Sequence, residues 1–202
     1  MPNSEAVVEQ FLGTYGLATE RYRKSERRSG KTPDYKVLQD ERLVFFCEVK
    51  NSEKDRWLDD LLDQADSGEV VGGLRSDPIF NRLTSHIHNA RKQFDAVNPD
   101  QDKPNVLAFH NEDKRAGFLD LLAVTTGNFF ADDGKVFPIY KNFSEGRIKA
   151  DVERIHLFIW LDEYKPFRFL FNTISSRHQG ELCSVFRFDP SGIMLVRAQR
   201  ES

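Results

Sequence analysis

Two acids and one lysine on neighbouring predicted strands have the most specific chemical spacing in this chain. Asp34 follows Pro33, and the triplet Glu48-Val49-Lys50 ends the next apolar run. Because side chains alternate along a strand, Glu48 and Lys50 share one face. If Asp34 pairs opposite the end of that strand, the two carboxylates converge, and their hard oxygen atoms suit Mg²⁺ or Mn²⁺ better than Zn²⁺. This pattern is typical of a metal-dependent phosphodiesterase.

A β-hairpin is the element that must position these side chains. Residues 32–38 and the β-prone run 43–50 are separated by a polar turn at 39–42. The alternation predicts that Val44 and Phe46 share the face of Glu48 and Lys50. It places Phe45, Cys47 and Val49 on the opposite face. The alternative is an ordinary strand whose last residues emerge into solvent as an exposed ion pair.

The residues Pro33-Asp34 and Glu48-Val49-Lys50 together resemble the signature of the PD-(D/E)XK nuclease superfamily, the fold of restriction endonucleases and Holliday-junction resolvases. The resemblance implies that Asp34 and Glu48 bind one or two divalent ions and that the backbone carbonyl of Val49 adds a ligand. It implies that Lys50 positions or activates the attacking water. Many members carry a glutamate on the first helix, and Glu9 stands in a comparable place, with Glu5 a weaker candidate.

The same resemblance implies an α/β fold with a restriction-endonuclease-like α-β-β-β-α-β core and a mixed central sheet. We expect this core over residues 4–110 and a strand-rich extension over 111–202, together forming one domain. Apolar periodicity and capping residues predict the elements. The predicted helices are 4–15, 52–65, 77–97 and 114–130, with a glycine-rich loop at 68–73, and the predicted strands beyond the hairpin are 18–27, 105–110, 136–140, 155–160, 167–171 and 183–188.

Basic residues are concentrated just before Asp34, although the net charge of the chain is −3. Cations beside a carboxylate site hold the phosphates of a polyanionic substrate. The alternative is a solvated surface. The candidate nucleic-acid-binding residues are Arg21, Arg23, Lys24, Arg27, Arg28 and Lys31, with Lys92 and Gln93 on the predicted helix 77–97 as loosely matched additions.

Composition agrees with a globular, cytoplasmic protein. The chain has 202 residues, of which 39% are hydrophobic, and the 17 phenylalanines are interpreted mainly as core. No apolar stretch reaches 18 residues, so the sequence predicts no membrane span. Cys47 and Cys183 lack metal-ligand spacing and are expected to be reduced. His86 and His88 do not face one another on a helix, and we expect both at the surface.

Three functions are compatible with these residues. The first is a Mg²⁺- or Mn²⁺-dependent nuclease that hydrolyses phosphodiester bonds in DNA or RNA. The second is a catalytically inactive nuclease-fold binding module, or a partner subunit of a nucleic-acid-processing or defence complex. The third is a small-ligand-binding α/β protein. Cutting both strands of a duplex would favour a homodimer. A partner protein would be one source of specificity, because no DNA-reading motif is recognisable.

Overall fold

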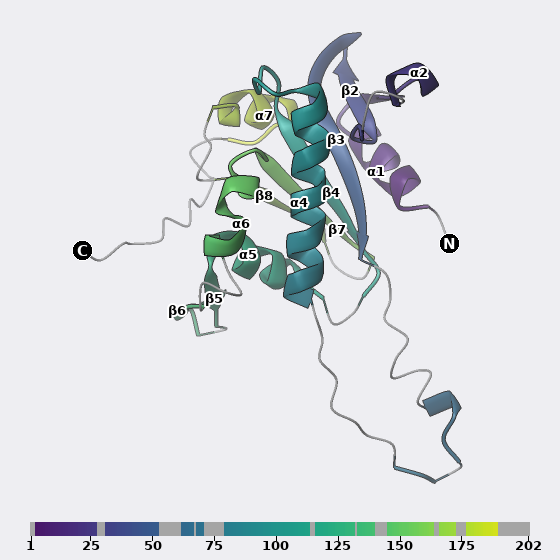
Figure 1. Ribbon diagram of the computed structural model, residues 1–202, viewed down its shortest axis with the longest axis vertical. Helices are drawn as coiled ribbons and strands as arrows, with labels where there is room; N and C mark the ends of the chain where they lie inside the picture. Colours follow the sequence, from purple (N-terminus) through teal and green to yellow (C-terminus); the bar gives the residue numbers. More distant parts are fainter. Residues whose placement is uncertain are drawn as a thin grey trace, which may run out of the picture.

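A mixed six-stranded sheet forms the centre of the protein, with helices packed on both of its faces (Figure 1). The computed structural model describes residues 3–27, 31–52, 62–66, 68–70, 79–113, 116–131, 133–139, 145–163, 166–172 and 177–189. The strand order is β1-β2-β3-β4-β7-β8. The prediction of an α/β protein with a mixed central sheet is confirmed.

The sheet is parallel in its middle and antiparallel toward both edges. β4 pairs in parallel with β3 on one side and with β7 on the other, and the remaining pairs are antiparallel. Every residue of β4 is buried, as expected for a strand covered on both faces. The strands are β1 (Ala18–Arg21), β2 (Tyr35–Gln39), β3 (Arg42–Ser52), β4 (Asn105–Asn111), β7 (Leu157–Asp162) and β8 (Arg168–Phe171).

Two separate apolar cores lie on the two faces of the sheet. The α1-side core contains Val8 and Leu12 of α1 (Ser4–Gly13) and Leu182 of α7 (Gln179–Val185). The α4-side core includes residues of α4 (Ile79–Val97), α5 (Phe118–Thr126) and α6 (Glu145–Val152). On α4, Leu83, Ile87, Ala90 and Phe94 are buried, at the three- and four-residue spacing of one helical face.

The predicted strand 183–188 is wrong, because residues 179–185 form the helix α7. Cys183 and Val185 alternate as in a strand. However, Leu182 and Phe186 are four residues apart and both belong to the α1-side core. That spacing places them on one helical face. Packing against the sheet decides the conformation in favour of the helix.

Other predicted elements are shorter than expected. Strand 18–27 ends at Arg21 and is followed by α2 (Lys24–Arg27). Helix 114–130 ends at Thr126, because Gly127 adopts a left-handed conformation with φ 74°. The residues after it form β5 (Asn128–Phe130), which pairs with β6 (Val136–Pro138) in a small separate sheet.

Ser52, predicted as the start of helix 52–65, is instead the last residue of β3. Residues 53–61 of that prediction, and residues 71–73 of the predicted glycine-rich loop, lie outside the described residues. Within the part of the chain that the structure describes, no helix is long and apolar enough to cross a membrane.

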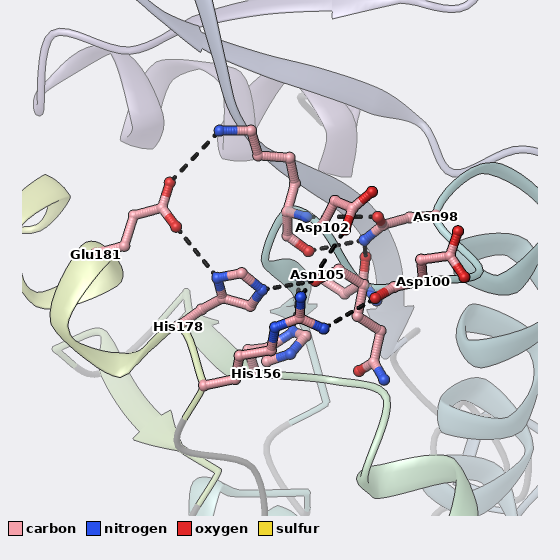
Figure 2. A network of polar contacts seen from close by, with 10 residues as sticks. Asn98, Asp100, Asp102, Asn105, His156, His178 and Glu181 are labelled. Atoms are coloured by element: carbon pink, nitrogen blue, oxygen red, sulfur yellow. Dashed lines mark hydrogen bonds and ion pairs between the residues drawn. The ribbon is translucent and has the colours of Figure 1, made fainter.

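A polar network joins the segment after α4 to the starts of β4 and β7 and to α7 (Figure 2). Asn105 accepts a hydrogen bond from Asn98 at 2.8 Å, donates one to the Arg154 carbonyl at 2.8 Å, and donates its backbone N–H to His156 Nδ1 at 2.9 Å. His178 Nε2 lies 2.8 Å from the Gln101 carbonyl. These contacts fix the amino ends of the parallel strands β4 and β7.

Loss of the Asn105 side chain should destabilise the protein strongly. Asn105→Ala removes an acceptor and a donor from a side chain that is 1% exposed, and leaves their partners unsatisfied. We expect the free energy of unfolding in urea to fall by roughly 2 to 4 kcal/mol. Asn89→Ala, at an exposed position of α4, is the matched control and should stay within about 0.5 kcal/mol of wild type. Equal stability of the two variants would contradict a structural role for this network.

Candidate functional site

The β2–β3 hairpin positions Asp34 beside Glu48. Its two-residue turn, Asp40-Glu41, has positive φ at both positions, 50° and 63°, as in the type I′ turns that suit twisted hairpins. The resulting register pairs Tyr35 with Cys47. Asp34, which directly precedes β2, therefore lies at the level of Glu48.

A β-bulge corrects one part of the predicted facing. The register of β2 against β3 shifts between Val37 and Leu38, and Val44 is the additional residue on β3. Val44 packs with the α1-side core, whereas Phe46 belongs to the α4-side core. The prediction that Val44 shares the face of Glu48 is thus wrong, because an additional residue reverses the alternation of every residue before it.

Asp34 and Glu48 are joined by two hydrogen bonds through the backbone. The backbone N–H of Asp34 donates to Glu48 Oε2 at 3.1 Å, and the backbone N–H of Val49 donates to Asp34 Oδ2 at 2.8 Å. Each carboxylate therefore accepts a hydrogen bond from the strand that carries the other one. This exchange holds two acids together at the end of the hairpin.

Lys50 lies against both Glu48 and α4. Its Nζ donates to Glu48 Oε1 at 2.5 Å and to Gln93 Oε1 at 3.5 Å. The Gln93 side-chain amide in turn donates to the Thr32 carbonyl at 3.0 Å. Gln93 thus links the lysine to the segment that leads into Asp34, and α4 becomes part of the site.

Burial of Glu48 makes the site electrostatically unusual. Its side chain is 2% exposed, and burial, followed by the nearby charge of Asp34, raises its pKa to about 7. Lys50 and Gln93 oppose this rise without cancelling it. Burial and the same two acids also raise the pKa of the adjacent Cys47 thiol. A further cation would therefore be stabilised at this position.

The donor set fits a hard divalent cation. Among the described residues no cluster of three or more His, Cys, Asp or Glu side chains could hold a metal. Mg²⁺, however, usually binds through one or two carboxylates and keeps several waters. Asp34 and Glu48 provide two carboxylates. A metal ligand must be deprotonated, and the positive charge of a bound ion would lower the raised pKa of Glu48 and so favour its ionised form. The role of the Val49 carbonyl as a ligand stays a prediction.

Glu9 lies beside different partners. Arg21 Nη2 is 3.5 Å from Glu9 Oε1, 2.6 Å from Glu5 Oε2 and 3.0 Å from the Tyr35 hydroxyl. No hydrogen bond or ion pair that the structure describes joins Glu9 to Asp34 or Glu48. Tyr35 belongs to the α1-side core, on the face opposite Phe46. Glu9 therefore shares Arg21 with Glu5 in this structure, and its role as a metal ligand stays a prediction.

The predicted cationic stretch is only partly described. Arg23 and Lys31 are exposed, and Arg21 is half-exposed but paired with Glu5. The side chains of Lys24 and Arg27, and all of Arg28, lie outside the described residues. On α4, Lys92 is exposed and Gln93 is half-buried beside Lys50. Among the candidate binding residues whose side chains the structure describes, only Gln93 contacts this site.

Sequence reasoning missed His86, which was expected at the surface. It is half-buried and packs edge-on to Phe109. Burial, followed by the charges of Lys50 and Arg82, lowers its pKa to about 4. His86 precedes Gln93 by seven residues, two helical turns, so the periodicity of α4 contained a signal that both share one face. His88, in contrast, is exposed and contacts Asp151.

Comparisons of the chain with protein-family models, with curated proteins and with solved structures found no match. The geometry and chemistry of the site are therefore the basis for assigning a function.

The raised pKa of Glu48 predicts a pH-dependent stability difference. A pKa that rises on folding stabilises the protein below about pH 4.5, and this contribution is lost as the pH rises toward 7. We expect the free energy of unfolding of wild type in EDTA, minus that of Glu48→Gln, to fall over this range by on the order of 3 kcal/mol. The exposed Glu163→Gln is the control and should follow wild type. Parallel curves for wild type and Glu48→Gln would contradict the burial argument.

Proposed function

We propose that the protein is a Mg²⁺- or Mn²⁺-dependent nuclease that hydrolyses phosphodiester bonds. The observation that carries the proposal is the buried pair Asp34 and Glu48, held together through the backbone and flanked by Lys50. An ordinary strand end would expose such charges to water, yet Glu48 is fully buried. Burial of a charged group without a structural need is a feature of functional sites.

The order of the elements supports the same proposal. Among the described residues, the elements from α1 to β4 run α1-β1-β2-β3-α4-β4, with the small helix α2 between β1 and β2, and β4 lies parallel to β3. This is the α-β-β-β-α-β order expected for a restriction-endonuclease-like core. We propose this fold for residues 4–110, with the later strands as an extension of its sheet.

The residues of the chain have separable roles in the proposed reaction. A bound divalent ion supplies positive charge against the phosphate and acidifies water. Asp34 and Glu48 would hold that ion. Lys50 has three N–H donors, and Glu48 and Gln93 accept two of them among the described residues. These contacts fix the direction of the third N–H of Lys50, which can orient the attacking water or a phosphate oxygen.

Cleavage should depend on the ion and on this residue set. Purified protein incubated with labelled single- and double-stranded DNA and RNA should cut at least one of them with Mg²⁺ or Mn²⁺ and none with EDTA. Glu48→Ala and Lys50→Ala should each lower the rate by a factor of at least ~10². The exposed Glu153→Ala and Lys149→Ala are matched controls and should cut like wild type.

The outcomes separate the proposed functions. Wild-type rates for Glu48→Ala would remove the nuclease proposal. Binding of nucleic acid without cleavage under all conditions would instead support the nuclease-fold binding module.

Thermal melts test the metal site without a substrate. Millimolar Mn²⁺ should raise the melting temperature of wild type, since an ion that binds only the folded chain stabilises it. Asp34→Asn retains an oxygen that can accept the Val49 N–H but loses one negative charge. Its metal-free form should be as stable as wild type or more so, while most of the metal-induced shift disappears. Asp100→Asn, at an exposed site, should keep the full shift, and equal shifts for Asp34→Asn would exclude Asp34 as a ligand.

A further inference from the structure

A pocket of about 300 Å³ opens beside the candidate site. Its walls come from the segment between β1 and β2, from β2 and β3, and from the last turn of α4. The volume lies at the lower end of the range for small-ligand sites. The pocket therefore has room for one small group rather than for a whole helix or duplex.

Three residues that line the pocket lie two strand residues or one helical turn away from residues of the site. Phe46 precedes Glu48 by two residues on β3, and Lys36 of β2 follows Asp34 by two residues. Two residues along a strand span roughly 7 Å on the same face. Val97 follows Gln93 by four residues on α4, which is about one turn. A nucleotide whose phosphate lies at Asp34 and Glu48 can therefore reach the pocket with its own base.

The walls of the pocket suit a nucleobase better than a second phosphate. The aromatic side chains of Phe46 and Tyr22, 8% and 7% exposed, and the aliphatic side chain of Val97 line the pocket. The one cation in the described lining, Lys36, is already paired with Glu26 at 2.7 Å and lies 4.7 Å from the centre of the Tyr22 ring. An acid in the wall disfavours a phosphate, whereas apolar surface with a donor and an acceptor at its edge matches a flat heterocycle.

We propose that this pocket, the base pocket, binds the nucleobase next to the scissile phosphate. The inference rests on the proposed nuclease function and adds the substrate class. A base in a duplex is paired and stacked, so it enters such a pocket only from a single strand, a frayed end or a flipped nucleotide. The substrate is therefore single-stranded nucleic acid, or a strand that has been opened at the cleavage position.

An abasic scan tests this assignment. Single-stranded oligonucleotides carry one abasic residue at each position in turn around the mapped cut, in DNA and in RNA, with Mn²⁺. For wild type, an abasic residue at one position adjoining the cut should lower kcat/KM at least about tenfold, as expected when a bound base is removed. Abasic residues farther away should have little effect.

Filling the pocket should remove this dependence. Ala96 lines the pocket at an exposed position of α4, so Ala96→Trp obstructs it without disturbing either core. This variant should cut the intact strand as slowly as wild type cuts the sensitive abasic strand, with no additional loss on the abasic strand. Ala150→Trp, the same change at an exposed position of α6, should behave like wild type. Unchanged melting temperatures would show that both variants fold.

Each outcome distinguishes the base pocket from the nuclease proposal. Cleavage that is equal on intact and abasic strands, or equal for Ala96→Trp and wild type, overturns the base pocket and leaves the nuclease intact. If no substrate is cut, the nuclease proposal fails. Titration in EDTA with nucleoside 5′-monophosphates and with ribose 5-phosphate then tests the pocket alone. Binding of the nucleotides only, weakened by Ala96→Trp, supports it, and absence of binding overturns it.

Discussion

Burial of the Glu48 carboxylate is the constraint on which the arrangement of the site depends. An ionised carboxylate removed from water costs several kcal/mol unless hydrogen bonds and opposite charge compensate it. The structure supplies both through Asp34 N–H and Lys50 Nζ. These contacts exist only in one register of β2 against β3, because a slip by one residue would reverse the faces of β2. The carboxylate therefore specifies the hairpin as much as the hairpin positions the carboxylate.

Two buried histidines change the stability of the protein with pH in the direction opposite to Glu48. Burial holds the pKa of His86 and of His156 at about 4, so both stay neutral in the folded chain. Their contribution to stability is lost as the pH falls from about 6.5 toward 4, because the unfolded chain binds protons that the folded chain refuses. Glu48 acts in the reverse direction over nearly the same range. A divalent ion would remove the Glu48 contribution and leave that of the histidines.

Features governed by local periodicity were predictable from the sequence, and features governed by packing were not. The hairpin, the buried strand β4 and the inward face of α4 follow from alternation and helical spacing. The Val44 bulge does not, because the β2–β3 pairing with the bulge and the pairing without it both direct apolar residues toward the two cores. The helix α7 does not follow from the pattern either, because Cys183 and Val185 alternate as in a strand and only packing against the sheet favours the helix. The base pocket could not be predicted, since Tyr22 and Val97 are brought together only by tertiary structure.

The contacts that build the site and its surroundings differ greatly in sequence separation. Asp34, Glu48 and Lys50 belong to one hairpin, whereas β3 pairs with β4 across more than fifty residues, as between Phe46 and Asn105. Short loops close at lower entropic cost than long ones, so the hairpin can form before α4 and β4 arrive. If α4 docks after the hairpin has formed, Glu48 stays hydrated until α4 encloses it. In a chevron experiment, the effect of Glu48 ionisation should consequently appear in the unfolding limb rather than in the refolding limb.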